Sequence, residues 1–308
     1  MSFTPLPKAL AKGAINYGGQ RRALIREQFF RLARRFTPLL VAEQDGLRFY
    51  VRTDDLGVGR VTFTDMSIER RTLEHAFACL EALGTPPEKL HSGSFVDIGA
   101  NIGTTSITAV AKQMVAGAIC IEPLPDNQAL LEQNAELNGV AGRVELLPFA
   151  ASDREGEVLF ERSADNWGDG RVRVNGAAAP GEFGEAERET FDVPATTLDA
   201  LQQKGEIAPE ETSLVWIDAQ GHEAQILAGA RTLLGSGLPV VTEFWPYGLR
   251  RAEGLERFYE LTAEMFSRYV DLGTVEDPER PEPRPTAEIA GLAERYEGVT
   301  FTDLLLLA

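Results

Sequence analysis

The sequence is poor in cysteine, in basic residues and in long apolar runs, and each shortage removes a class of protein. Its 308 residues contain two cysteines, Cys79 and Cys120. Two are too few for a disulfide-built scaffold, so we expect both to be reduced thiols in the core. No apolar run is long enough to span a bilayer, and the first residues lack the apolar segment of a signal peptide. These absences predict a cytoplasmic protein.

The shortage of basic residues argues against a nucleic-acid-binding protein. The net charge is −17 at pH 7, so a phosphate backbone would be repelled and we expect no nucleic-acid partner. The chain is long enough for one large domain, or for a domain with an N-terminal addition.

Residues 1–41 depart from this acidic composition. They hold eight lysines and arginines against one acid, Glu27. Apolar residues between Arg21 and Phe36 have helical spacing and predict an amphipathic helix. The favoured interpretation is a helix that packs on the acidic body, or on a second copy in a homo-oligomer. The alternative is a helix that binds a membrane surface or an acidic partner.

The next segment has the short alternating pieces of a hairpin-rich cap. Three strands are predicted within residues 39–63, followed by a helix over 67–83. We therefore divide the chain into an N-terminal basic helix and cap, 1–92, and a main domain, 93–308.

The main domain alternates strands with helices, which predicts an α/β fold. Its sheet should be mostly parallel, with helices on both faces. Residues 162–190 lack periodicity and predict a mobile excursion. The predicted strands are 94–98, 117–121, 143–149, 213–218, 238–244 and a closing run at 304–307, and the predicted helices are 102–114, 126–138 and 221–234.

The stretch FVDIGANIGTTSI, Phe95 to Ile107, organises the main domain. It joins a buried strand to a helix through a glycine turn, in which the backbone can approach a ligand closely. The turn reads Gly99-Ala-Asn101-Ile-Gly103, so it lacks the middle glycine with which a nicotinamide-binding turn holds phosphate. Asp97, just before the turn, would repel a pyrophosphate. It would suit the ammonium group of S-adenosylmethionine.

Later strand ends add polar residues to the same edge of the sheet. Glu122 follows the second strand, at the distance where a carboxylate accepts both hydrogens of a ribose diol, and Leu124 can lie against adenine. Asp218 ends the strand in SLVWIDAQGHEAQILAGA, and Glu243 ends the next strand. His222 follows Asp218 at a predicted helix start, whose dipole should lower the pKa of the imidazole.

Taken together, these motifs resemble FkbM-family methyltransferases over about residues 93–246. The resemblance rests on VDIGANIG, IEPLPDN, FAASD, TTLDAL, WIDAQGHEAQILAGA and VTEFWP, in that order. It implies a class I Rossmann-like fold with a seven-stranded sheet whose last strand is antiparallel. It also implies S-adenosylmethionine as cofactor and methyl transfer to a hydroxyl of a sugar or secondary metabolite. The implied cofactor-binding residues are Asp97, Gly99, Asn101, Gly103, Glu122, Leu124, Ala150 and Asp218.

Several assignments stay open at this point. His222, Asp218 and Glu243 are each candidates for the base that removes the acceptor proton. No metal is expected, because Glu243-Phe244 replaces the Asp-Asn pair of catechol-type methyltransferases.

Residues of the excursion and the catalytic status of the protein are also open. Trp167, Arg171 and Arg173 are either acceptor-binding or solvated. The alternatives to an enzyme of this kind are a binding or scaffold module that lost catalysis and, less favoured, a nicotinamide-dependent oxidoreductase.

Overall fold

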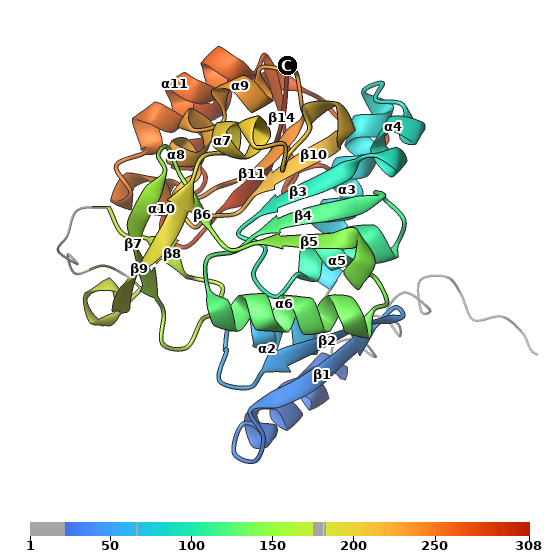
Figure 1. The fold of residues 1–308 in the computed structure, drawn as a ribbon, viewed down its shortest axis with the longest axis vertical. Coiled ribbons are helices and arrows are strands. Elements are labelled where there is room, and N and C mark those ends of the chain that lie inside the picture. Colours follow the sequence, from blue (N-terminus) through green and yellow to red (C-terminus); the bar gives the residue numbers. More distant parts are fainter. Residues whose placement is uncertain (1–21, 66, 175–180, 182) are drawn as a thin grey trace, which may run out of the picture.

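The computed structural model describes residues 22–65, 67–174, 181 and 183–308, and its centre is one twisted sheet (Figure 1). The strand order is β13-β12-β14-β11-β10-β3-β4-β5. The strands are β3 Ser94–Ile98, β4 Gly117–Ile121, β5 Val144–Leu147, β10 Thr212–Ile217, β11 Val240–Phe244, β12 Arg268–Asp271, β13 Arg284–Pro285 and β14 Thr302–Leu307.

The sheet confirms the class I methyltransferase fold. Strands β5, β4, β3, β10 and β11 are parallel, and β14 is antiparallel to both of its long neighbours, β11 and β12. The predicted seven strands are present, and the two-residue β13 adds an eighth at the edge. Parallel strands place their carboxyl ends at one edge, so the turns after β3, β4, β10 and β11 converge.

Helices cover both faces of the sheet, as predicted. One face packs against α3 Ser67–Ala82, α5 Thr104–Ala111 and α6 Pro125–Leu137. The other face packs against α7 Leu198–Gln203, α8 Glu223–Ala228, α9 Arg231–Leu234, α11 Leu255–Met265 and the 3-10 helix Thr286–Glu294. Shorter pieces, α4 Pro87–Ser92, α10 Pro246–Arg251, and 3-10 turns at Ala141–Arg143 and Pro209–Glu211, connect these elements.

The helix predicted over 221–234 is two helices, which corrects the prediction. The break falls at Gly229 and Ala230, between α8 and α9. The carbonyl oxygen of Ser152 approaches Gly229 so closely that a Cβ there would lie 2.1 Å from it. This close approach ends α8 and ties it to the segment that follows β5.

The N-terminal cap contains two of its three predicted strands, β1 Leu39–Gln44 and β2 Leu47–Arg52, paired as a hairpin. The third prediction is wrong, because residues 59–63 lie in α2 Val58–Thr64. Asp55 accepts hydrogen bonds from the N–H groups of Gly57 (2.9 Å) and Gly59 (2.7 Å), which bends the chain into a helical turn. These hydrogen bonds favour a helix over the strand that the β propensity of residues 59–63 predicts.

The hairpin docks on α6 through two asparagines. Asn134 accepts from the Tyr50 N–H at 2.7 Å, and Asn138 accepts from the Arg48 N–H at 3.0 Å. The cap and the sheet share one continuous apolar core, which also buries both free cysteines. The boundary at residues 92 and 93 stays a prediction.

Residues 150–196 build a second, four-stranded sheet beside the carboxyl edge of the first (Figure 1). The expected excursion at 162–190 is therefore largely a built structure where it is described, while 175–180 and 182 lie outside the described residues. Its strands are β6 Ala150–Ala151, β7 Gly156–Arg162, β8 Arg171–Val172 and β9 Glu189–Thr196, with a 3-10 turn at Glu185–Glu187.

Candidate functional site

A cavity lies at the carboxyl ends of β3, β4 and β10. Its position is that of a ligand site in an open α/β fold. It brings together seven of the predicted site residues: Gly99, Asn101, Glu122, Leu124, Ala150, Asp218 and His222.

The glycine turn forms the floor of the cavity. Gly99 has φ +81°, and a Cβ on it would lie 1.9 Å from the carbonyl oxygen of Asp218, so only glycine allows this contact between the two strand ends. Asn101 also has a positive φ, 51°, which is unfavourable for a residue with a side chain. Its conformation is held from two sides, because its N–H donates to Glu122 Oε2 (2.9 Å) and its Nδ2 donates to the carbonyl oxygen of Trp167 (3.1 Å).

Glu122 is a buried carboxylate that accepts three hydrogen bonds. Besides Asn101, it accepts from the Leu124 N–H (2.9 Å) and from Asn127 Nδ2 (3.2 Å), both at Oε1. Burial raises the pKa of Glu122 to about 7, and the hydrogen bonds oppose that rise. The carboxylate is thus fixed in place on the cavity wall.

Asp97 and Gly103 are not among the described residues that line the cavity. Asp97 is buried beneath the turn beside Ser106, and burial raises the pKa of Asp97 to about 7. No described residue donates a hydrogen bond to its Oδ2. Gly103 caps α5 with φ +83° and faces Ile107. Their roles as cofactor contacts stay predictions.

Two further carboxylates meet across Gln220 at the β10–β11 side of the site. Gln220 Nε2 donates to Asp218 Oδ1 (2.7 Å) and to Glu243 Oε2 (3.2 Å). Asp218 lines the cavity, whereas Glu243 lies behind Gln220. Burial raises the pKa of both carboxyls, and the charge of Asp218 raises the pKa of Glu243 further. Gln220 itself has φ 53°, so the bridge is held in a strained backbone position.

Glu223 holds the turn that presents Asp218 and Gln220. Its Oε1 accepts from the Ala219 N–H (3.0 Å) and the Gly221 N–H (3.1 Å). The side chain is fully buried, and burial raises the pKa of Glu223 to about 7. Glu223 is therefore a structural anchor for the strand end.

His222 lines the cavity and contacts the segment that follows β6. Its Nε2 is 3.0 Å from Ser152 Oγ. Burial lowers the pKa of His222 to about 4. The predicted direction of this shift is correct, but its main cause is desolvation, and α8 is only six residues long.

A loop from the second sheet covers the cavity. Trp167, Gly168 and Gly170 line it from above. The N-terminal cap holds this loop: Asp55 Oδ1 accepts from the Trp167 N–H (3.1 Å), and the Arg52 guanidinium lies over the Trp167 ring at 3.9 Å from its centroid. Because Trp167 also binds Asn101, the cap, the loop and the glycine turn form one chain of contacts.

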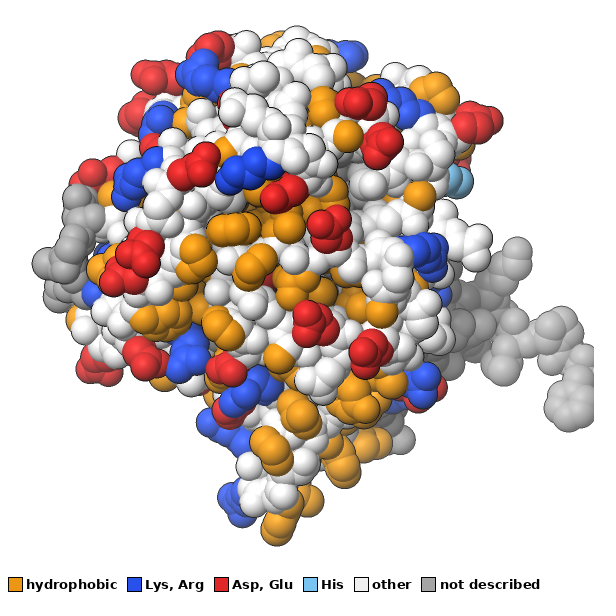
Figure 2. All heavy atoms as spheres, viewed as in Figure 1, with side chains coloured by type: hydrophobic (Ala, Val, Ile, Leu, Met, Phe, Trp, Pro, Cys, Tyr) orange, Lys and Arg blue, Asp and Glu red, His pale blue; other side chains and the backbone are white. Residues whose placement is uncertain are grey.

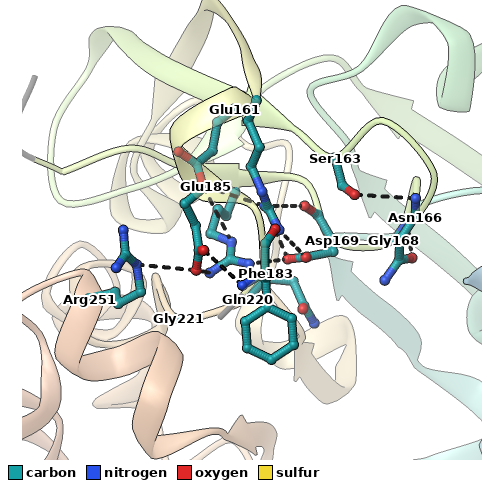
Figure 3. Close-up of polar contacts among 12 residues, drawn as sticks. Glu161, Ser163, Asn166, Gly168, Asp169, Phe183, Glu185, Gln220, Gly221 and Arg251 are labelled. Atoms are coloured by element: carbon teal, nitrogen blue, oxygen red, sulfur yellow. Dashed lines mark hydrogen bonds and ion pairs between the residues drawn. The ribbon is translucent and has the colours of Figure 1, made fainter. Parts of the chain in front are cut away.

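The base of this loop is an ion-pair network (Figure 3). Arg171 and Arg188 are buried, and both pair with Asp169. Arg173 Nε pairs with Glu161 Oε2 at 2.6 Å. Neither Arg171 nor Arg173 is a solvated loop residue, which corrects that interpretation. Buried pairs of this kind fix the geometry of a segment, because an unpaired partner would be strongly destabilising.

Sequence reasoning missed Gln220, Asp55 and Ser152. Gln220 lay inside a recognised motif, but its role depends on a positive φ and on the neighbouring strand. Asp55 and Ser152 act on partners 112 and 70 residues away. Among the described residues, no group of three or more acidic, histidine or cysteine side chains is arranged to hold a metal ion.

Comparison with known proteins gives a family match. Residues 97–268 match the family described as "Methyltransferase FkbM domain". A protein named 2-O-methyltransferase NoeI, from Sinorhizobium fredii, is 28% identical over 156 residues, 48% of this chain and 62% of its own length. A protein named hexuronic acid methyltransferase AglP, from Haloferax volcanii, is 27% identical over 147 residues, 48% of this chain and 54% of its own length. The chain thus spans a little over half the length of each of these relatives.

Among solved structures, the chain is similar to the crystal structure of methyltransferase FkbM from Methylobacillus flagellatus. It is 16% identical, with a TM-score of 0.41, over 70% of this chain and 44% of the other.

Proposed function

This chain belongs to the FkbM methyltransferase family, and on that premise we propose that it binds S-adenosylmethionine in the cavity and methylates a hydroxyl group. The observation that carries the proposal is the pairing of Glu122 and Asp218 on one cavity, on either side of the Gly99 turn. The Glu122 carboxylate suits a ribose diol. The Asp218 carboxylate is placed to accept the proton of the acceptor hydroxyl.

The residues that line the cavity suit the proposed cofactor in charge and in polarity. The rim of the cavity carries carboxylates, which suit a ligand with an ammonium and a sulfonium and no phosphate. Glu122 already has its carboxylate oriented by three donors, so it is set to accept from two ribose hydroxyls. Leu124, Phe149 and Ala150 supply an apolar wall suited to adenine. When bound, S-adenosylmethionine supplies a methyl group on a positively charged sulfur, ready for displacement.

On the acceptor side, we assign the base role to Asp218. Its raised pKa makes it a stronger base than an ordinary aspartate, and part of its surface faces the cavity. The acceptor hydroxyl gives its proton to the Asp218 carboxylate as the oxygen forms its bond to the methyl carbon. Gln220 orients that carboxylate, and the charge of Asp169 raises its proton affinity.

His222 is a poorer candidate for the base. A pKa of about 4 keeps the imidazole neutral at pH 7 but makes it a weak proton acceptor. Its Nε2 is already engaged with Ser152. We therefore give His222 a positioning role in the wall beside Ala150.

For the acceptor, we favour a sugar hydroxyl. Support comes from the two relatives, one named for 2-O-methylation and the other for hexuronic acid. Partly buried Phe183 and Tyr247, whose ring centroids are 5.1 Å apart, can add an apolar surface for a sugar ring.

The test separates cofactor binding from transfer. Calorimetry with S-adenosylmethionine and with NADH should show binding of the first only. Incubation with methyl-labelled cofactor and a panel of methyl glycosides of hexoses and hexuronic acids should then label at least one sugar. Binding with no label in any hydroxylated acceptor would favour a binding module, and no binding of S-adenosylmethionine would refute the assignment of the cavity.

A further inference from the structure

The N-terminal helix carries an apolar stripe that the body of the protein does not cover. Residues 22–33 are helical, and Phe30 and Ala33 pack into the core. A second side is solvent-facing, and Leu24 (62%) is exposed as well. The large apolar side chains of that side and their exposed fractions are Ile25 (70%), Phe29 (53%), Leu32 (55%) and, just past the helix, Phe36 (79%).

The spacing of these residues makes a continuous stripe. They follow one another at intervals of four, three and four residues, which places them along one side of a helix. Val41 of β1 is also exposed (44%). A contiguous apolar patch of this kind on an otherwise polar surface marks an interaction site.

The favoured expectation is a helix that packs on the acidic body or on a second copy. The Phe30 side packs on the body. Phe30 belongs to the buried core cluster that also contains Phe63. Phe29 stacks on the Phe63 ring, but 53% of the Phe29 surface stays exposed. The helix has two apolar sides, and one of them is left for a partner.

The charge of the N-terminal region indicates which kind of partner the stripe would bind. Residues 1–41 carry eight basic residues and one acid, while the other 267 residues carry 22 basic and 46 acidic residues. Arg22 and Arg35 are exposed and, by helical spacing, lie on either side of the stripe. Figure 2 shows apolar and basic side chains together at the end of the molecule where Figure 1 shows β1.

From this we propose that the helix at residues 22–33, with the turn at 34–36 that follows it, binds an anionic lipid surface, lying flat in the interface with its apolar stripe inserted. Phe and Leu side chains along one side of a helix with arginines at its margins are the pattern of interfacial helices. An anionic surface attracts this end of the molecule and repels the acidic body, so the protein is held in one orientation. This is surface binding; no helix in the described part of the chain is long and apolar enough to cross a bilayer.

The test is flotation of the full chain with phosphatidylcholine vesicles that do or do not contain phosphatidylglycerol. The protein should float with the anionic vesicles, and high salt should release it, because screening weakens the arginine contribution. Phe29→Ser with Phe36→Ser should lower the bound fraction at least about tenfold. Arg22→Gln with Arg35→Gln should lower it about fivefold for each charge removed.

A matched control removes apolar residues from another exposed site. Val299 (64% exposed) and Phe301 (56% exposed) lie outside the helix, so Val299→Ser with Phe301→Ser should bind vesicles like the unchanged protein. Cofactor binding by every variant checks that each one folds. Equal flotation of all variants, or none by the unchanged protein, would overturn the proposal. The unchanged protein could instead form a dimer that does not bind vesicles. If Phe29→Ser with Phe36→Ser then made it a monomer, the partner of the stripe would be a second copy of the chain and not a lipid surface.

Discussion

Two groups of carboxylates lie on the same edge of the sheet, and their surroundings give them different chemistry. Glu122, after β4, accepts from two backbone N–H groups and one amide. Asp218 and Glu243, after β10 and β11, share a single amide donor from Gln220. Burial raises the pKa on both sides. The number of donors separates a carboxylate that is fixed for binding from one that is free to take a proton.

Substitution of Asp218 tests this comparison most severely. Asp218→Asn keeps the shape and the Gln220 contact but removes the proton acceptor, so kcat should fall by about 10²–10⁴-fold. The rate is measured by transfer of labelled methyl to whichever glycoside proves active. The matched variant is Glu243→Gln, behind Gln220, for which we expect a smaller loss, about tenfold. A larger loss for Glu243→Gln would move the base from Asp218 to Glu243.

Glu122 should show the opposite pattern, a loss of binding. Glu122→Gln replaces one acceptor oxygen with a donor, so the binding free energy of S-adenosylmethionine should weaken by about 1–3 kcal/mol in calorimetry. Turnover at saturating cofactor should change little. Glu145→Gln, an exposed change on neighbouring β5, serves as the control. Unchanged affinity in Glu122→Gln would remove the ribose assignment.

The pH dependence of cofactor affinity follows from the same residue. The pKa of Glu122 is raised to about 7, and only its ionised form accepts from both ribose hydroxyls. Affinity should therefore fall as pH drops below about 7, by up to about tenfold per unit, and binding should release protons. Calorimetry in buffers of different ionisation enthalpy measures this release. Affinity that rises toward acid pH would contradict the ionised state.

The cap should contribute through the loop that it holds. Asp55→Asn removes an acceptor for the Trp167 N–H or for the helix start at Gly59, so we expect about a fivefold weaker affinity for the cofactor. Saturating cofactor should restore kcat, since Asp55 holds the loop through Trp167 and not through the residues assigned to proton removal. The control is Asp192→Asn, an exposed change in β9 of the same small sheet. A kcat deficit that saturation does not restore would place the loop in catalysis.

His222 should give the smallest effect on turnover. The neutral, weakly basic imidazole is not needed for proton removal, so His222→Gln should change kcat by no more than about threefold. The assay is the same labelled transfer. A loss comparable with that of Asp218→Asn would return the base role to His222.

The site was predicted best where one strand and its own turn supply the residues. Gly99, Asn101, Glu122 and Leu124 lie within two turns that the sequence spells out, and all four line the cavity. Asp97 was placed by the same logic but points beneath the turn, because its position on β3 faces Ser106 in α5. Neighbours along the chain are visible in a sequence, whereas the face that a side chain takes depends on packing.

By itself, the sequence determined the fold class, six of the eight strands of the main sheet and the family. These depend on apolar periodicity and on short motifs, which are local properties. Tertiary structure alone decided the rest: the helix at 59–63 in place of a strand, the loop held over the cavity by Asp55, the bridge from Gln220 to Glu243, and the uncovered stripe on the N-terminal helix. Each of these depends on burial and on contacts between distant segments, because desolvation and hydrogen-bond partners exist only once the chain has folded.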